Sequence, residues 1–328
     1  MKNNPIKIGV VGVGHLGQHH VKHYKSLKNV KLVGIFDTDK KRAEEVSLKY
    51  EVRIFYELED LIEKTSALSI VTPTRYHVDV AALCIKKQKH VFIEKPITAT
   101  LEEADRLLFL AKNNEVIIQV GHIERLNPAL LALNPYQIKP KFIELQRLAP
   151  YTSRGTDVPV VLDKMIHDID ILLSLADAPV KTIQATGLSI LTDSIDIAHA
   201  RIRFENGTVA SIMSSRVAKD EVRKIKIFQK DLYATIDLLM GLTEVYNIKE
   251  KSGNSNAELI VPFEYKNKKQ FIAYEKPTLI SGDPLKMELE NFILSILGKE
   301  TPIVSGKAGR DALEVAMEIQ RMIIQDLH

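Results

Sequence analysis

One stretch near the start of the chain, residues 7–37, constrains the fold more than any other. Its first apolar run, 8–13, leads into three glycines with the spacing G-x-G-x-x-G: Gly12, Gly14 and Gly17. A segment of helical length follows, and a second apolar run then ends on Asp37, about twenty residues after the third glycine. This order of strand, glycine turn, helix, strand and acidic residue predicts a βαβ unit that binds a dinucleotide.

Each glycine has its own task in such a unit. Gly12 permits the tight turn out of the strand, Gly14 lets the backbone approach the pyrophosphate, and Gly17 lets the helix lie close to the sheet. The helix begins near His15 and Leu16, where free N–H groups and the positive end of the helix dipole face the phosphates. We therefore expect this turn to hold the pyrophosphate.

Asp37 bears on the choice between the two nicotinamide dinucleotides. At the tip of the second strand, its carboxylate would accept hydrogen bonds from the adenosine ribose and would repel the 2′-phosphate of NADP. The basic run Lys40, Lys41 and Arg42 weakens that preference. NAD is the expected cofactor, and NADP stays open.

Length and composition narrow the class of protein. A chain of 328 residues with 45% apolar residues suggests a globular protein of two domains. The net charge of +3, with both signs interspersed, gives no reason to expect nucleic acid or an anionic membrane as a partner. The single cysteine, Cys84, rules out an internal disulfide and fits a reducing compartment. Because the first apolar run is too short for a signal peptide or a membrane span, a cytoplasmic protein is expected.

Strand-like and helix-like runs alternate up to residue 121, which predicts an α/β domain with a parallel sheet covered on both faces. The expected strands are 6–13, 30–37, 52–55, 67–72, 90–94 and 116–121. The expected helices are 17–26, 39–50, 58–64, 75–87 and 101–112, the last of them capped by Thr100. Residues 1–121 are therefore predicted to form a Rossmann domain with the full six strands.

Beyond residue 121 the pattern changes to repeated strands with few helices. Two of the strands, 195–204 and 208–216, flank Asn206-Gly207 and predict a hairpin. The other expected strands are 141–148, 181–191, 222–228 and 232–238, and the expected helices are 127–133, 160–175, 284–297 and 306–325. Residues 251–256 and 266–269 are expected to be solvated loop. Residues 122–328 are thus predicted to form an α+β domain with a mainly antiparallel sheet.

Lys95 stands where a ligand is expected. Ligands of open α/β sheets bind beyond the carboxyl ends of the strands, and Glu94-Lys95-Pro96 comes directly at the end of the fifth predicted strand. The proline also restricts the backbone of Lys95. A surface lysine that opens a loop is the alternative interpretation.

A second candidate lies on the predicted helix 160–175. Asp163 and His167 are four residues apart and therefore share a face, and Asp170 follows three residues later among apolar neighbours. A carboxylate beside a histidine orients the imidazole for proton transfer. The alternatives are a capped helix with solvated acids, or a metal site of these three residues. Since no further Cys or His is near in sequence, no metal is expected.

The first helix carries four histidines: His15, His19, His20 and His23. His19 and His23 have the i, i+4 spacing of a metal pair, but no glutamate follows the first of them in the position of a general base. We expect His15 and His19 to line the pyrophosphate turn and the other two to be surface residues.

With these residues in hand, the chain resembles the Gfo/Idh/MocA oxidoreductases. The similarity runs through the glycine turn, Asp37, Val71-Thr72-Pro73 with His77, Glu94-Lys95-Pro96, the pair of Asp163 and His167, and 302–306. It implies catalytic roles for Lys95, Asp163 and His167, and a cofactor site that also includes Thr72, Pro73, His77 and Glu94. It further implies a C-terminal domain built on a large open sheet, whose outer face forms a homodimer or homotetramer.

Within that family, three stretches are similar to members that oxidise a nucleotide sugar: 12–20, 121–130 and 154–170. Two arginines in these stretches, Arg125 and Arg154, are candidates to bind a diphosphate through two hydrogen bonds each. A surface or interdomain salt bridge is the other interpretation of each arginine.

The expected function is NAD-dependent transfer of a hydride from a secondary hydroxyl of a sugar, above all a nucleotide sugar. His167 would accept the hydroxyl proton, Lys95 would stabilise the reacting oxygen, and Asp163 would hold His167 in place. Which of Lys95 and His167 is the formal base stays open, and the mechanism needs both beside the nicotinamide ring. The alternatives are a dehydrogenase of free sugars or inositol, a biliverdin-like reductase, and a non-catalytic sensor of NAD or a nucleotide sugar.

Overall fold

The computed structural model describes residues 4–152, 158–250, 257–266 and 268–327. The chain forms two compact units. Unit 1 takes the residues up to 123 together with 282–313, and unit 2 takes 124–281 together with the residues from 314 onward. This division differs from the expected one at residue 121, because 282–313 join the first unit rather than the second.

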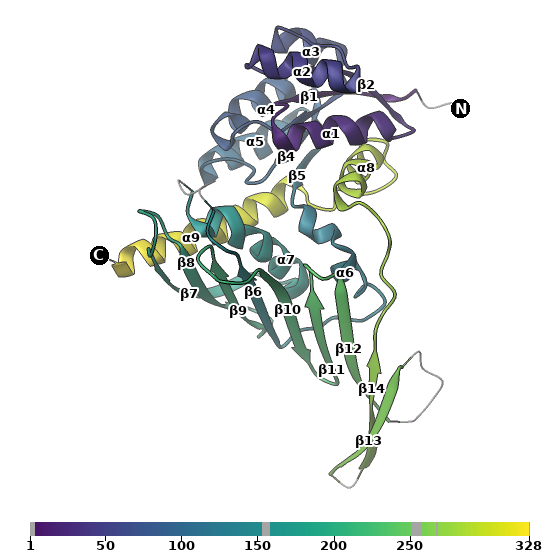
Figure 1. Cartoon of the computed structure of the whole chain (residues 1–328), viewed down its shortest axis with the longest axis vertical. Helices are drawn as coiled ribbons and strands as arrows, with labels where there is room; N and C mark the ends of the chain where they lie inside the picture. The colour runs from purple at the N-terminus through teal and green to yellow at the C-terminus, as the bar shows by residue number, and fades with distance from the viewer. Residues whose placement is uncertain (1–3, 153–157, 251–256, 267, 328) are drawn as a thin grey trace. The chain divides into compact units, whose positions relative to one another are not determined.

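The sheet of unit 1 has five parallel strands in the order β2-β1-β3-β4-β5 (Figure 1). These are β1 (Ile6–Val11), β2 (Val30–Phe36), β3 (Ala67–Ile70), β4 (His90–Glu94) and β5 (Ile118–Gly121). The expectation of six strands is wrong, since 52–55 forms only one isolated parallel bridge, between Ile54 and Ile35. The segment pairs so briefly because the chain turns into the next helix at Leu58.

The helices of unit 1 agree with the expected ones. They are α1 (His15–Ser26), α2 (Lys40–Tyr50), α3 (Leu58–Lys64), the 3₁₀ turn η1 (Thr74–Tyr76) with α4 (His77–Lys86), and α5 (Leu101–Asn113). The predicted cap is confirmed, because the Thr100 hydroxyl accepts from the Glu103 backbone N–H and the Glu103 carboxylate accepts from the Thr100 N–H.

The late helix α8 (Pro284–Ile296) belongs to unit 1 because its apolar face completes the core there. Leu289 and Phe292 are fully buried, and the ring of Phe292 meets that of Phe92 on β4 edge-on, with the centroids 5.8 Å apart. Two buried aromatic rings in this arrangement contribute more stabilising free energy to a core than the burial of their surface area alone would give. The last helix, α9 (Gly306–Leu327), begins in unit 1 and ends in unit 2.

Unit 2 is built on a nine-stranded sheet in the order β13-β14-β12-β11-β10-β6-β9-β8-β7 (Figure 1). All neighbours are antiparallel except β6 and β9, which are parallel. The strands are β6 (Phe142–Leu148), β7 (Val180–Leu188), β8 (Ile197–Phe204), β9 (Val209–Ser215), β10 (Val222–Gln229), β11 (Leu232–Asp237), β12 (Leu242–Lys249), β13 (Leu259–Tyr265) and β14 (Lys268–Glu275). The predicted hairpin is β8-β9, and Gly207 in its turn has φ +86°.

The sequence analysis missed the strands β12, β13 and β14. Lys268 and Lys269, expected in a loop, begin β14 and pair with Tyr265 and Glu264 of β13. The two lysine side chains are exposed although their backbone is paired. The segment therefore has the polar composition of a loop and the hydrogen bonding of a strand. The expected loop at 251–256 lies outside the described residues.

The helices of unit 2 lie against one face of its sheet. They are the 3₁₀ turn η2 (Ile123–Leu126), whose first residue belongs to unit 1, the short α6 (Pro128–Leu131), and a π-helical turn η3 (Val161–Met165) that continues as α7 (Ile166–Ala176). The expected single helix 160–175 is therefore two kinds of helix. Figure 1 shows α7 over the middle strands, where Ile143, Leu145 and Ile225 are fully or almost fully buried.

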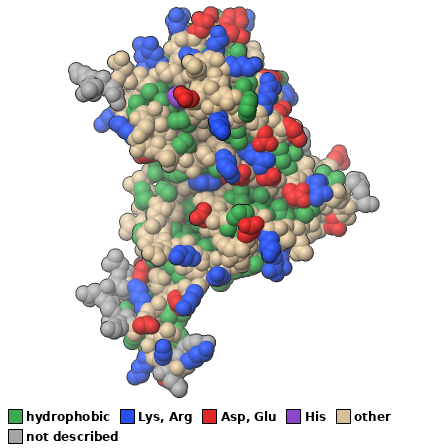
Figure 2. All heavy atoms as spheres, turned by 180° about the vertical axis from the view of Figure 1, so that it is seen from behind, with side chains coloured by type: hydrophobic (Ala, Val, Ile, Leu, Met, Phe, Trp, Pro, Cys, Tyr) green, Lys and Arg blue, Asp and Glu red, His purple; other side chains and the backbone are tan. Residues whose placement is uncertain are grey.

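The surface carries charges of both signs. On the face that Figure 2 shows, lysine and arginine side chains are mixed with aspartate and glutamate, in keeping with the nearly equal numbers of basic and acidic residues, 45 and 42, in the chain. Among the described residues, no helix combines the length and the apolar character that crossing a membrane requires.

Candidate active site

The glycine turn between β1 and α1 is so tight that two of its positions admit no side chain. Gly12 has φ +85°, and a Cβ there would lie 2.7 Å from the Val71 carbonyl oxygen. A Cβ on Gly17 would lie 2.0 Å from the carbonyl oxygen of Gly12. The tasks predicted for these two glycines, a sharp turn and close contact between helix and strand, are confirmed.

Gly14 differs, since a Cβ at this position would meet nothing within 4 Å. The space beside the turn is open, and no side chain caps α1, so its first backbone N–H groups face this space. His15 and Leu16 in the first turn of α1 are exposed. An anion such as a pyrophosphate fits this arrangement of open space and N–H donors. Binding at Gly14, His15 and Leu16 stays a prediction.

Asp37 lies just after β2 and is oriented by the glycine turn. Its Oδ2 accepts a hydrogen bond from the Val13 backbone N–H at 2.8 Å, and its Oδ1 accepts one from the Asp39 N–H at 2.9 Å. A carboxylate oxygen has a second lone pair, so both can still accept a ribose hydroxyl. The Arg42 guanidinium lies 3.6 Å from Oδ1. This positive charge would attract the 2′-phosphate of NADP, and it therefore weakens the preference of the site for NAD.

The carboxyl end of β3 is joined to that of β4 by His77. Its ring nitrogens lie 2.8 Å from the Thr72 carbonyl oxygen and 2.9 Å from that of Pro96. Burial lowers the pKa of His77, although the two carbonyls act in the opposite sense. The almost completely buried His77 therefore supports the edge of the sheet from within.

Thr72 has a free hydrogen-bonding group at this edge. Its buried hydroxyl has no hydrogen-bond partner among the residues that the structure describes. Buried polar groups in native proteins are nearly always paired. A polar ligand at the ends of β3 and β4 would pair the Thr72 hydroxyl, which agrees with the predicted cofactor site of Thr72, Pro73 and Glu94.

Glu94 is the last residue of β4, Lys95 follows it, and the Glu94 carboxylate is held by the first helix. Its Oε1 lies 3.0 Å from His20 Nε2, and its Oε2 accepts from the Lys95 backbone N–H at 3.3 Å. Lys95 itself is half-buried. Its expected position at the carboxyl edge of the parallel sheet is therefore confirmed, while its catalytic role stays a prediction.

The expectation that His20 and His23 lie on the surface is wrong. His20 is fully buried, with Nδ1 2.8 Å from the Ser69 hydroxyl, and His23 Nε2 lies 3.4 Å from Asp283 at the start of α8. The reason is helical periodicity, because the face of α1 that contains Gly17 must lie on the sheet, and residue 20 is on that face. The close packing required at Gly17 was the signal that the sequence analysis left unused.

In unit 2, Asp163 and His167 lie at the junction of two helix types. Asp163 is in the π-helical turn, with Oδ2 3.6 Å from Lys164 Nζ, and His167 is in the first turn of α7. Both are half-buried. Single π-helical turns occur frequently at functional sites. The catalytic roles of both residues, and their meeting with Lys95 on one substrate, stay predictions.

The next two acids on α7 are each paired with an arginine. Asp168 forms two hydrogen bonds with Arg147, of 2.8 and 2.9 Å, and Asp170 forms two with Arg125, of 2.6 and 2.8 Å. Asp170 is thus occupied by a guanidinium, and no group of metal-binding side chains is present among the described residues. Diphosphate binding by Arg125 stays a prediction beside this observed salt bridge, and Arg154 lies outside the described residues.

Arg147 is a residue that the sequence analysis missed. It follows Ile143 and Leu145 at alternate positions of β6, on the face that α7 covers. The two-residue period of a strand is the signal that predicts its burial. Besides Asp168 on α7, the Glu124 carboxylate lies 3.0 Å from Arg147, so the buried guanidinium has acidic partners on two elements.

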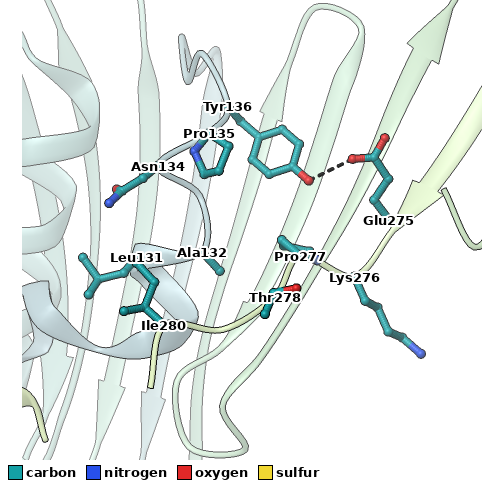
Figure 3. Close-up of a pocket in the computed structure, with 10 residues that line it drawn as sticks. All are labelled: Leu131, Ala132, Asn134, Pro135, Tyr136, Glu275, Lys276, Pro277, Thr278 and Ile280. Carbon is teal, nitrogen blue, oxygen red and sulfur yellow. Dashed lines mark hydrogen bonds between the residues drawn. The ribbon is translucent and has the colours of Figure 1, made fainter. Parts of the chain in front are cut away.

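A cavity of about 540 Å³ lies elsewhere in unit 2, between the segment after α6 and the segment after β14. Figure 3 shows the Tyr136 hydroxyl donating to Glu275 Oε2, at 2.9 Å. Glu275 also pairs with Lys249 at 2.8 Å, so its carboxylate is already occupied. None of the residues predicted to act in catalysis lines this cavity.

Comparison with known proteins adds a family match to this geometry. The model of the oxidoreductase family Gfo/Idh/MocA, with an NAD-binding Rossmann fold, matches residues 6–122. The model of the Gfo/Idh/MocA C-terminal domain matches residues 144–231. The two matches fall on the two parts of the chain in which the cofactor and the substrate residues are predicted.

Individual relatives are similar over nearly the whole chain. The chain is 34% identical to UDP-N-acetylglucosamine 3-dehydrogenase of Acidithiobacillus ferrooxidans over 316 residues, 96% of each protein. A solved structure of that enzyme has a TM-score of 0.88 at 33% identity and covers 99% of both chains. Myo-inositol 2-dehydrogenase of Thermotoga maritima is 26% identical over 94% of this chain and 93% of its own.

Proposed function

The chain belongs to the Gfo/Idh/MocA family of NAD-binding oxidoreductases, and from that premise we propose that it oxidises a secondary hydroxyl of a nucleotide sugar. The first candidate is the C3 hydroxyl of UDP-N-acetylglucosamine. The observation that carries this choice is the 34% identity to a UDP-N-acetylglucosamine 3-dehydrogenase, which extends through the substrate part of the chain as well as the cofactor part.

The residues of unit 1 fit a nicotinamide dinucleotide. The open space beside Gly14 and the first N–H groups of α1 suit the pyrophosphate, and Asp37 suits the adenosine ribose. The unpaired hydroxyl of Thr72 offers a hydrogen bond further along the same edge. A bound NAD supplies the hydride acceptor, and the protein supplies its orientation.

Three side chains would act on the sugar. Lys95 hydrogen-bonds the reacting oxygen and stabilises negative charge as it develops there. His167 accepts the hydroxyl proton, and Asp163 holds its imidazole in the orientation that proton transfer requires. If Lys95 is instead the formal base, His167 becomes the hydrogen-bond donor to the same oxygen.

The direct test is the appearance of NADH absorbance when the protein is mixed with NAD and UDP-N-acetylglucosamine. Free N-acetylglucosamine and myo-inositol are the comparison substrates, since an inositol dehydrogenase is also a full-length relative. We expect turnover with the nucleotide sugar. Turnover with myo-inositol alone would show that the substrate is a cyclitol and not a nucleotide sugar. NAD binding without turnover of any of the three compounds would identify a sensor.

The catalytic residues are tested by Lys95→Ala and His167→Ala. We expect each to abolish turnover and to leave the NAD dissociation constant nearly unchanged. Lys87→Ala, which removes an exposed lysine of unit 1 outside the proposed site, is the matched control and keeps the wild-type rate. Wild-type rates in both alanine variants would refute the assignment.

We also propose that the protein is a homo-oligomer formed through the outer face of the nine-stranded sheet. Arg147 points to α7, so the alternate residues of β6, including Phe142, point to the opposite face. There a row of aromatic side chains crosses neighbouring strands, with ring centroids 4.8 to 5.9 Å apart: Phe142, Phe228, Tyr233, Tyr246 and Tyr274. A continuous aromatic row on an open face favours a protein interface.

We also propose that the protein is cytoplasmic, on the chemistry of its one cysteine. Cys84 is buried and forms no disulfide. This agrees with the reducing environment of the cytoplasm.

A further inference from the structure

His20 is the feature of unit 1 that the proposed function leaves without a task. It lies on α1, is fully buried, and connects two strands of the sheet. Its Nδ1 lies 2.8 Å from the Ser69 hydroxyl on β3, and its Nε2 lies 3.0 Å from the Glu94 carboxylate at the end of β4. Burying an imidazole in the core is costly unless both nitrogens are paired, and here both are.

The partners determine which way these hydrogen bonds run. A carboxylate only accepts, so Nε2 carries the hydrogen and donates to Glu94. Nδ1 pairs with the Ser69 hydroxyl, which can either donate or accept. The ring of Phe92 lies edge-on to the imidazole, with the centroids 5.4 Å apart. His20 is thus fixed in one orientation, with a hydrogen-bond donor directed at Glu94.

Glu94 is confined from the other side as well. Gly121 is its neighbour in the register of β4 and β5, and a Cβ on Gly121 would lie 2.8 Å from Glu94 Oε1. The missing side chain of Gly121 is therefore what gives the carboxylate its place. The second carboxylate oxygen accepts from the backbone N–H of Lys95. Helix α1, strand β5 and the Lys95 backbone together hold one carboxylate at the edge where the dinucleotide is expected.

We propose that His20 is a positioning residue that acts through Glu94. It holds the corner formed by Glu94 and Lys95, and so sets the affinity for the dinucleotide and the placement of the Lys95 amine. The second effect rests on the proposed function, whereas the first needs only dinucleotide binding. Glycine at position 121 is the matching requirement on the opposite side of the carboxylate.

The test compares three substitutions by NAD titration and by turnover. In His20→Phe, which keeps a ring but removes both hydrogen bonds, we expect NAD to bind roughly tenfold more weakly and kcat to fall, as loss of a hydrogen bond to a charged group predicts. Gly121→Ala, which displaces Glu94 and leaves His20 intact, should give the same result. His20→Gln, whose amide can still donate to Glu94, should restore most of the affinity.

His23→Gln is the matched control, because it replaces a buried histidine one turn along the same helix, whose partner Asp283 lies outside the site. It should keep the wild-type NAD affinity even where thermal unfolding shows a loss of stability. In a Glu94→Ala background, His20→Phe should cause no further loss of NAD affinity. Such non-additivity distinguishes action through Glu94 from a general loosening of α1.

Four results would overturn the proposal: an unchanged NAD affinity in His20→Phe, equal losses of affinity in the His20 and His23 variants, additive losses in the His20 and Glu94 double variant, or no recovery in His20→Gln. Because NAD titration needs no sugar, the outcome is decided even if no sugar is turned over. If the wild type turns over no sugar but the variants change NAD affinity as expected, the proposed function is refuted and the role of His20 is not. Normal turnover with an unchanged NAD affinity in His20→Phe would refute the role of His20 alone.

Discussion

The Asp37 carboxylate accepts a hydrogen bond from the backbone N–H of Val13, 2.8 Å away, so the tip of β2 is tied to the glycine turn that follows β1. The two parts of the predicted dinucleotide site, the phosphate turn and the ribose acid, are therefore held together before any ligand binds. Preorganisation of this kind lowers the entropy that binding must overcome.

Removing this tie should weaken NAD binding and change the preference between the two dinucleotides. In Asp37→Ala we expect roughly a tenfold loss of NAD affinity, because both the ribose acceptor and the anchor of the turn disappear. NADP should lose less, since its 2′-phosphate no longer meets the Asp37 carboxylate while the Arg42 guanidinium remains nearby. Titration with each dinucleotide measures both effects. Asp60→Ala, which removes an exposed carboxylate in the first turn of α3, should leave the ratio of the two affinities unchanged.

The buried ion pair of Arg147 and Asp168 should be essential for the stability of unit 2. In Arg147→Met the Asp168 carboxylate stays buried without its partner, which costs about 3–5 kcal/mol. Urea denaturation gives the change in the free energy of unfolding. Arg223→Met removes a more exposed arginine that also contacts Glu124, and should cost less than about 1 kcal/mol. A loss for Arg147→Met as small as that of Arg223→Met would contradict the inference.

Asp196 should make the stability of unit 2 depend on pH in the acidic range. Burial alone would raise the pKa of Asp196, but hydrogen bonds from Leu191, Thr192 and Ile190 outweigh it and lower the pKa to about 2. A lowered pKa stabilises the fold above the unfolded value of about 3.9, and this contribution is lost as the pH falls toward 2.

The free energy of unfolding of the wild type should therefore drop by roughly 2 kcal/mol more between pH 5 and pH 2 than that of Asp196→Asn. Urea titrations at both pH values provide the comparison. Asp193→Asn, a substitution of an exposed neighbour, should retain the pH dependence of the wild type. Parallel pH curves for wild type and Asp196→Asn would show that the carboxylate does not act in this way.

The aromatic row should hold the oligomer together. Phe228 is a 40% exposed member of that row, and Phe228→Asp would bury a charge in the proposed interface. We expect this variant to be monomeric by light scattering after size-exclusion chromatography. Phe109→Asp changes a phenylalanine of α5 that is 65% exposed in unit 1, and should leave the mass unchanged. A monomeric wild type would remove the basis of the proposal.

Much of unit 1 could be predicted because its signals lie close together in the chain. The glycine turn and the Thr100 cap with Glu103 each depend on a few consecutive residues, as does the hairpin at Asn206-Gly207 in unit 2. The short bridge at Ile54 was overestimated as a sixth strand, since an apolar run does not reveal how many residues find a partner. Likewise, the exposed lysines of β14 concealed a strand whose pairing comes from its backbone.

By itself, the sequence determined the Rossmann character of unit 1, the position of Lys95 at the end of a strand, and the family. These features are written in local spacing and in motifs. Only the tertiary structure decided that α8 joins unit 1, that β6 and β9 run parallel, and that His20 and Arg147 meet their carboxylates inside the two cores. Burial and ion pairing depend on residues that are far apart in the chain. A local sequence pattern does not show which of these residues will contact one another.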